Sequence, residues 1–421
     1  MRSLLLHLPT IRFEYYGVEV LAAFVLLGLF ALLLLRHLGL LDSRRAVLVS
    51  VLLLFIALDI RWHILCRLSF DYNYFLSEWV AHYRDNGGFA AFSTVYETCN
   101  YHVLYLYFLA GMSYLPVNDL YLIKLLSIFF DLVLAYAAAR LLGCLGVQQR
   151  IRMRCFFLVL FLPSVILNSS YWAQCDSIYV SLAILGITLG LEDRPIRSML
   201  CITLSFCFKL QAVFLLPVYA LLWMHGKLKL RHLLLFPVFY VAVLTPAVLM
   251  GRPLVDTLLF YLTHLTSAGT GLNAFSASVF ALLSVPPERE VFAAKLAIGI
   301  AFLLVCAVLL LCLCRRRRMT DRTVVLAAVL FSVMIPFCLP YMHDRYFYAA
   351  DVLLLVLAFL VREALPTPVF SQLSSCNVYC HALWDRLLFP VFVGSLLQIP
   401  GLLLSAAAFL RSFRPPAPDQ G

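Results

Sequence analysis

The sequence predicts an all-α polytopic membrane protein, and three observations carry this prediction. Hydrophobic residues make up 63% of the 421-residue chain. Charged residues make up only 13%, roughly half the share of about 25% that is usual in soluble domains. Apolar runs of about 20 residues, the length that crosses a bilayer as a helix, recur along the chain. A membrane β-barrel would instead alternate apolar and polar residues.

We expect about ten to twelve transmembrane helices of about 20 residues each. The clearest apolar runs are 20–35, 47–66, 120–142, 233–250, 291–314, 323–339 and 346–360. Asp59 and Arg61 favour an early end of the run 47–66. Two other runs, 155–167 and 178–191, are short for a span, so the polar segment between them is expected in a protein-lined cavity.

Three further stretches depart from a simple span. The run 199–224 starts and ends at cytoplasmic loops and contains Lys209, which favours two half-helices. The stretch 102–116 is short and tyrosine-rich, as in an interfacial or re-entrant helix. Pro400 interrupts the stretch 387–410, and its topology is left open.

The basic residues cluster in short loops between the apolar runs. The clusters are Arg36 with Arg44 and Arg45; Arg150, Arg152 and Arg154; Lys227, Lys229 and Arg231; and 315–318. Such loops favour the cytoplasmic side, so the segment 67–101 is expected outside it. The net charge of +10 therefore reflects topology, with lipid headgroups as a secondary use, and we expect no nucleic-acid partner.

The predicted organisation is a single integral-membrane domain, 1–413, followed by a polar tail, 414–421. Its first large outer loop, 67–118, carries the candidate catalytic residue and an interfacial helix. A second outer loop spans 251–290. The thirteen cysteines show no metal-ligand spacing, and no metal site is assigned.

The leading candidate for catalysis is Asp71, a carboxylate at the exit of an early span, followed at once by aromatic residues. A carboxylate in this position can accept a proton from an attacking hydroxyl. The alternative is a helix cap or a solvated loop charge. Tyr72, Trp79, Asn100 and Tyr101 lie in the same loop and are candidate sugar or acceptor contacts.

A second cluster lies between the two short apolar runs. Trp172, Gln174 and Asp176 combine an aromatic face, which can cover a sugar ring, with groups that can bind hydroxyls. The alternative is an interfacial aromatic belt. Asn273 is a weaker candidate contact, for which a loop cap is at least as good an explanation.

Cationic residues form the remaining candidates. Lys209 lies within an apolar run, so it requires a carboxylate or an anion as its partner. His343 and Arg345 are natural phosphate ligands, with a snorkelling boundary cluster as the alternative. Lys124 and Asp131 lie two turns apart on one helix face and are assigned to helix packing.

These motifs together resemble a known family. The residues that carry the resemblance are Asp71, Tyr72 and Trp79; Gly87, Gly88 and Phe89; Asn100, Tyr101, Leu104 and Tyr105; 171–176; Phe208, Lys209, Leu210 and Gln211; and 343–347. Over 69–351 the chain resembles bacterial integral-membrane glycosyltransferases of the C-type (GT-C) fold, relatives of the second mannosyltransferase of eukaryotic GPI-anchor synthesis. It departs from their pattern at Ala173, usually Gly, and Asp344, usually Glu, and lacks a Pro near His102.

The resemblance implies a GT-C fold and an inverting transfer of a hexose, here mannose, from a polyprenyl-phosphate donor to a glycan, lipid or protein acceptor. By the same resemblance Asp71 is the general base, and Lys209, His343 and Arg345 bind the donor phosphate. The expected location is the outer face of a bacterial cell membrane. No cofactor is assigned; a divalent cation shared by Asp71 and Glu97 is left open. The alternatives are a transporter or flippase of a lipid-linked glycan, and a noncatalytic scaffold.

Overall fold

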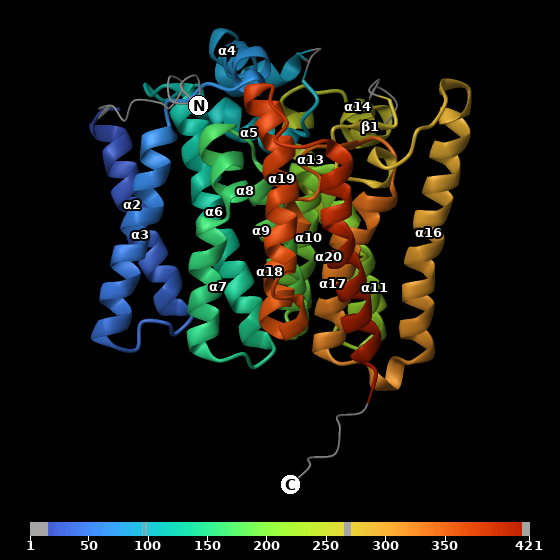
Figure 1. The fold of residues 1–421 in the computed structure, drawn as a ribbon. Coiled ribbons are helices and arrows are strands. Elements are labelled where there is room, and N and C mark those ends of the chain that lie inside the picture. The colour runs from blue at the N-terminus through green and yellow to red at the C-terminus, as the bar shows by residue number, and fades with distance from the viewer. Residues whose placement is uncertain (1–15, 95, 97–98, 265–270, 415–421) are drawn as a thin grey trace.

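The computed structural model describes residues 16–94, 96, 99–264 and 271–414. This part of the chain is a bundle of upright helices with short helices gathered across one end (Figure 1). The predicted all-α class is therefore confirmed. The strands of the described part form one short parallel pair, β1 (Asn273–Ala274) with β2 (Met342–His343).

The helical elements follow one another with few long connections. In the first half they are α2 Val18–His37, α3 Arg44–Ile64, η1 Tyr72–Leu76, α4 Ser77–Asp85, η2 Gly88–Ser93, α5 Val103–Met112, α6 Asp119–Cys144, α7 Gln149–Phe161, α8 Pro163–Ile166, η3 Leu167–Tyr171, α9 Asp176–Leu191 and α10 Pro195–Phe208. In the second half they are η4 Leu210–Leu215, α11 Pro217–Met224, α12 Leu230–Leu233, α13 Leu235–Leu249, α14 Leu254–Leu258, α15 Phe260–His264, η5 Val279–Ala281, η6 Pro287–Arg289, α16 Glu290–Cys314, η7 Arg316–Arg318, α17 Asp321–Cys338, α18 Tyr348–Leu360, η8 Arg362–Ala364, α19 Thr367–Trp384 and α20 Val391–Arg411.

Seven helices of the described part are long and apolar enough to cross a bilayer, which supports a polytopic membrane protein. The number becomes eight if α7 and the α8–η3 segment, bent by 49° at Pro163, count as one span. Five shorter apolar helices lie among them, including α9 and α10. Whether these also cross the membrane, as a total of ten to twelve spans requires, stays a prediction.

Breaks in two helices create the polar interior of the bundle. Leu162 is extended ahead of Pro163, and the chain then turns through η3 before α9 begins. Lys209 is likewise extended, with φ −150° and ψ 137°, between α10 and η4. The expectation of half-helices in 199–224 is therefore confirmed, and so is the enclosure of the segment between α8 and α9.

Three expectations about helix boundaries need correction. The helix α3 does not end early: it continues to Ile64, and Arg61 is buried rather than at a boundary. The helix α20 runs through Pro400 without a break. The helix α19 was not expected at all, because its buried face carries serine and amide side chains that make hydrogen bonds inside the bundle.

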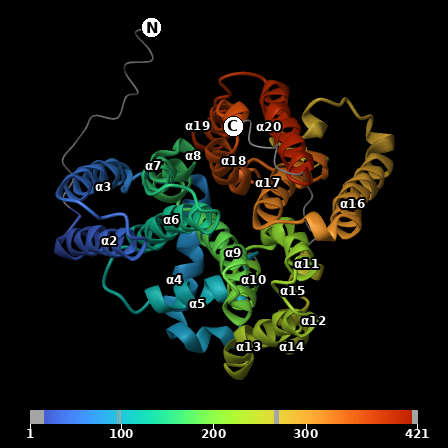
Figure 2. The ribbon, with the colours of Figure 1, turned by 90° about the horizontal axis from the view of Figure 1, so that it is seen from below.

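The basic loops lie together at the end of the bundle away from α4. Figure 1 shows the α2–α3, α6–α7 and α16–α17 connections at the lower end, while α4 and α14 lie at the upper end. The α11–α12 loop joins the lower group, because His225 lies 2.7 Å from Asp321 at the start of α17. The four basic clusters thus share one end, as the topology prediction requires. Figure 2 shows the same bundle from below.

Two glycines, Gly186 and Gly190, allow α9 to approach α10 and α11 closely. The Ser198 Oγ of α10 donates a hydrogen bond of 2.6 Å to the Gly186 carbonyl, and Tyr219 Oη of α11 donates one of 3.3 Å to the Ser198 carbonyl. A Cβ at Gly186 would overlap Tyr219 Oη and lie 3.2 Å from the Ser198 carbonyl oxygen. Such close contact through small residues is how membrane helices gain packing energy.

We therefore predict that Gly186→Val lowers the free energy of unfolding by about 1–3 kcal/mol, the usual cost of overpacking a core. Thermal unfolding of the detergent-solubilised protein measures the change. Gly299→Val is the matched control, since this glycine of α16 has no neighbouring atom within 4 Å of an added Cβ. Equal melting temperatures for the two variants would contradict the predicted packing.

Candidate active site

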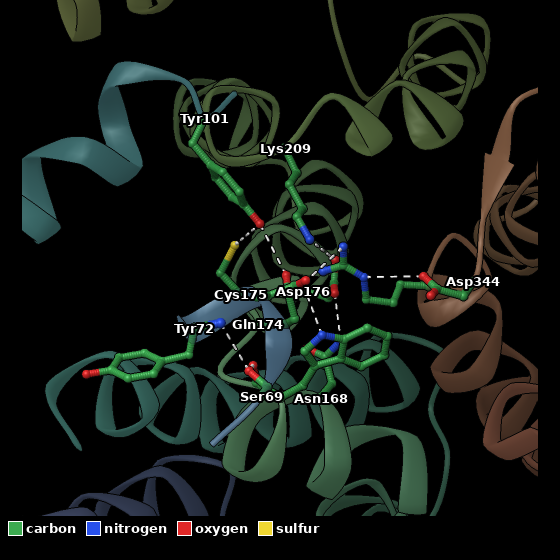
Figure 3. A network of polar contacts seen from close by, with 12 residues as sticks. Ser69, Tyr72, Tyr101, Asn168, Gln174, Cys175, Asp176, Lys209 and Asp344 are labelled. Atoms are coloured by element: carbon green, nitrogen blue, oxygen red, sulfur yellow. Dashed lines mark hydrogen bonds and ion pairs between the residues drawn. The ribbon is translucent and has the colours of Figure 1, made fainter. Parts of the chain in front are cut away.

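Four segments that are distant in sequence meet at the end of the bundle that carries α4. They are the start of η1 with Asp71, the link between η3 and α9 with Trp172, the break with Lys209, and the turn after β2 with Arg345. Figure 3 shows the resulting network of polar contacts. Each segment belongs to a helix terminus or a helix break, so backbone irregularity and charged side chains occur together.

Asp71 has one oxygen engaged and one available. Its Oδ2 atom accepts hydrogen bonds from the Trp172 indole N–H, at 3.0 Å, and from the Gln174 side-chain amide. No described residue donates a hydrogen bond to Oδ1, and the side chain is 24% exposed. The carboxylate is thus held in one orientation while its second oxygen can receive a hydroxyl proton.

The backbone around Asp71 is tied to the Trp172 segment. Ser69 Oγ donates a hydrogen bond of 2.7 Å to the Trp172 carbonyl and accepts one of 3.2 Å from the Tyr72 amide. Ala173, the next residue, has a φ of 65°, in the region that favours glycine. This conformation gives a physical reason for the glycine expected at that position. Ser69 was not among the predicted site residues, although its place just before Asp71 was a usable signal.

Arg345 is a partly buried cation, 20% exposed, with unused hydrogen-bond donors. Its guanidinium lies over the Trp172 ring, with 4.8 Å between Cζ and the ring centroid. The nearest carboxylates are those of Asp71, with 3.8 Å between Nη2 and Oδ2, and of Asp344, with 3.5 Å between Nε and Oδ1. Nε and Nη1 are buried and have no hydrogen-bond partner. Buried donors are normally satisfied, so these two are candidate donors to an anionic ligand.

Lys209 and Asp176 form an ion pair deeper in the same network. Lys209 Nζ lies 2.5 Å from Asp176 Oδ1, and Asn168 Nδ2 donates a hydrogen bond of 2.7 Å to Asp176 Oδ2. Tyr101 lies above this pair: its hydroxyl donates a hydrogen bond of 3.2 Å to Gln174 Oε1, and its ring centroid is 5.8 Å from Lys209 Nζ. The structure thus gives Lys209 the carboxylate partner that the sequence suggested.

His343 and Asn273 lie on the paired strands at the edge of the network. His343 is partly buried, and burial lowers the pKa of its imidazole, with Arg345 and Lys209 lowering it further. The Asn273 side chain donates to the Ser276 carbonyl at 2.9 Å and accepts from the Ser276 amide at 2.8 Å. Asn273 therefore shapes its own loop, and its carboxamide is already engaged.

The remaining predicted residues lie around the network. Trp79 is buried and packs edge-on against Tyr101, with 5.5 Å between ring centroids. Tyr72 points away from Gln174 (Figure 3) and lines a surface pocket of about 350 Å³ next to Arg84. Asn100 is exposed, and Glu97 lies outside the described residues. Among the residues described, no group of three or more His, Cys, Asp or Glu side chains is arranged to hold a metal ion.

Searches against protein-family models and against curated proteins find no match for this chain. The functional assignment below therefore depends on the geometry of the site and on the sequence motifs.

Asp344 lies 3.5 Å from Arg345 Nε, and its charge changes with pH in an accessible range. Burial raises the pKa of its carboxyl to about 6, and Asp71 and Asp176 add to the effect, while Arg345 opposes it. Below pH 6 the neutral carboxyl no longer competes with an anion for Arg345. We predict that a short isoprenyl phosphodiester, whose charge is constant in this range, binds more tightly at pH 5 than at pH 7.5.

Isothermal titration of the purified protein measures this change in affinity. Asp344→Asn should bind tightly at both pH values, while His343→Gln should keep the wild-type pH dependence. If Asp344→Asn keeps the full pH dependence, Asp344 is not the group that titrates.

Proposed function

We propose that this protein is an inverting membrane glycosyltransferase that moves a hexose from a polyprenyl-phosphate donor to an acceptor hydroxyl. One observation carries the proposal. Asp71, a carboxylate whose Oδ1 is free, lies beside the partly buried guanidinium of Arg345, with 3.8 Å between Asp71 Oδ2 and Arg345 Nη2, and the guanidinium has two unused donors. A base beside an anion site is what transfer from a sugar phosphate requires. The family resemblance supports the same reaction.

In the proposed reaction Asp71 Oδ1 accepts the proton of the acceptor hydroxyl. The acceptor oxygen attacks the anomeric carbon of the donor sugar as the bond from that carbon to the phosphate oxygen breaks. The phosphate leaves with the bonding electron pair, and a single displacement inverts the anomeric carbon. Trp172 and Gln174 donate hydrogen bonds to Asp71 Oδ2. We therefore assign them the role of orienting the base, in place of the sugar contacts predicted from the sequence.

The departing phosphate gains negative charge, and the proposed site meets that charge with cations. Arg345 offers Nε and Nη1, two donors on different edges of the guanidinium, and each can donate a charge-assisted hydrogen bond to a phosphate oxygen. Lys209 is paired with Asp176 in the resting site, and its positive charge lies close enough to stabilise a phosphate bound at Arg345. His343 lies two residues before Arg345 in the chain, and as a neutral imidazole it can donate one hydrogen bond.

The arrangement of the bundle supports an outward-facing site. The basic loops lie at the end away from α4, and such loops favour the cytoplasm. We therefore propose that the Asp71 network faces the outside of the cell membrane and that the helices form a GT-C fold. Mannose as the hexose follows from the family resemblance alone. A lipid-linked substrate fits a site at the end of the bundle that carries α4, where the spanning helices reach the membrane surface.

We predict that Asp71→Asn reduces turnover of a polyprenyl-phosphate hexose by about 100-fold or more, because general-base catalysis typically contributes factors of about 100 to 10,000. The donor KM should change little, since the amide keeps the shape of the side chain. Release of labelled sugar from the lipid measures turnover.

Asp85→Asn is the matched control, an exposed carboxylate at the end of α4. Wild-type turnover by Asp71→Asn would exclude Asp71 as the base. Movement of intact labelled lipid across the vesicle membrane, without sugar release, would indicate a flippase instead.

Arg345→Ala should weaken binding of the donor by about 10- to 100-fold, since a charge-assisted hydrogen bond contributes about 1.5–3 kcal/mol. Arg289→Ala, which removes an exposed arginine of η6 at the same end of the bundle, should leave binding unchanged. The measurement is donor affinity by titration in detergent. An unchanged affinity in Arg345→Ala would rule out the phosphate site proposed here.

A further inference from the structure

The helix α6 carries two buried charged residues, and each reaches a segment that builds the candidate site. Lys124 Nζ donates hydrogen bonds to the Leu65 carbonyl at 2.9 Å and to the Arg67 carbonyl at 2.6 Å. These carbonyls lie at the end of α3, where the chain continues to Asp71. An ammonium group at a helix C-terminus satisfies carbonyls that the helix leaves open. Lys124 therefore fixes the point from which the Asp71 segment starts.

Asp131, two turns further along α6, holds the second segment at both of its ends. Its Oδ2 atom accepts a hydrogen bond of 2.6 Å from Ser169 Oγ, and its Oδ1 atom accepts one of 2.5 Å from Ser177 Oγ. Ser169 precedes Trp172, and Ser177 follows Asp176 directly. One buried carboxylate therefore closes the loop that carries Trp172, Gln174 and Asp176.

The third segment is connected to the same carboxylate. The Ser177 hydroxyl also lies 2.7 Å from the Tyr348 hydroxyl, in the first turn of α18. Tyr348 follows Arg345 by three residues, and its amide donates a hydrogen bond of 3.0 Å to the Arg345 carbonyl. The turn that carries Arg345 is thus linked to Asp131 through the Ser177 and Tyr348 hydroxyl groups.

Arg61 pairs with Asp131 and holds its carboxylate in place. Its Nε and Nη2 atoms lie 3.1 Å and 3.0 Å from Asp131 Oδ2, and both side chains are almost fully buried. The guanidinium also donates to the Leu160 carbonyl of α7 at 3.0 Å. A buried carboxylate with a paired cation and two hydroxyl donors is fully satisfied, so it can act as a rigid attachment point.

We propose that Lys124 and Asp131 are positioning residues: from α6 they hold the base, its two N–H donors and the Arg345 guanidinium in fixed positions relative to one another. This inference rests on the proposed function, and it assigns to these residues a role beyond helix packing. Neither side chain contacts the Asp71 carboxylate, so their effect on the reaction passes through the three segments. A displacement of about 1 Å at a reacting group can cost about 100-fold in rate.

The chain offers a matched control for a role in packing alone. Asp351 on α18 is also fully buried, and its Oδ1 atom accepts hydrogen bonds from two serines, Ser371 at 2.5 Å and Ser375 at 3.0 Å. These serines lie on α19, outside the segments that build the site. Ser169→Ala/Ser177→Ala and Ser371→Ala/Ser375→Ala therefore remove the same number of hydroxyl donors from a buried carboxylate, and both leave the Arg61–Asp131 pair intact.

The first measurement compares the kinetics of sugar release by the two double variants. Ser169→Ala/Ser177→Ala should lose about 10- to 100-fold in kcat with little change in donor KM, since misorientation acts on the reacting groups. Ser371→Ala/Ser375→Ala should keep the wild-type kcat per folded molecule. Equal losses of kcat in the two variants, or a loss in neither, would overturn the proposal.

The second measurement does not depend on activity. Cys175 lies inside the tethered loop and is 1% exposed, while Cys155 on α7 is fully buried and serves as an internal reference. N-ethylmaleimide labelling, quantified for each peptide by mass spectrometry, should be about tenfold faster at Cys175 in Ser169→Ala/Ser177→Ala than in the wild type, from the loss of two hydrogen bonds.

The two measurements separate failure of this inference from failure of the proposed function. Protection of Cys175 as complete as in the wild type would overturn the positioning role, whatever the activity. Equal exposure of Cys175 in Ser371→Ala/Ser375→Ala would overturn it as well. If the wild type releases no sugar while Cys175 still responds to the loss of Ser169 and Ser177, the proposed function fails and the tether to Asp131 stands.

Discussion

A charge inside an apolar bundle needs a partner, and this constraint accounts for much of the structure. The Arg61–Asp131 pair is its clearest case, because it joins α3, α6 and α7. Asp131 also accepts a hydrogen bond from one serine hydroxyl at each end of the Trp172 loop. An unpaired carboxylate at this depth would cost several kcal/mol. The helices therefore have to meet where the pair can form, and the segments attached to it are fixed by the same requirement.

The candidate site meets this constraint only in part, because Arg345 keeps hydrogen-bond donors without a partner, and the proposed reactivity depends on these donors. Asp176 neutralises Lys209, so Lys209 does not attract an anion strongly in the resting site. Arg345 differs, because its nearest carboxylates lie 3.5 Å and 3.8 Å away and its Nε and Nη1 atoms make no hydrogen bond. An incoming phosphate is thus expected to contact Arg345 first.

Sequence reasoning found the elements whose signal is local and missed those that depend on distant partners. Lys209 marked the break between α10 and η4, since a lysine in an apolar run needs a reason. Arg61 gave the wrong expectation of a helix end, because its partner lies 70 residues away and nothing local indicates the pair. The helix α19 escaped notice since its core face is polar. Trp172 and Gln174 were placed in the site as sugar contacts, while their N–H groups turn out to hold Asp71, about 100 residues earlier.

The central claim is that the donor phosphate binds at Arg345 and that its sugar then faces Asp71 Oδ1, the oxygen that accepts no hydrogen bond. Cryo-electron microscopy of the purified protein with a non-hydrolysable polyprenyl-phosphate hexose analogue tests it most directly. We expect the phosphate within hydrogen-bond distance of Arg345 Nε or Nη1, about 2.7–3.2 Å, with the anomeric carbon facing Asp71 Oδ1. A phosphate bound elsewhere, with Arg345 still lacking an acceptor, would contradict the account.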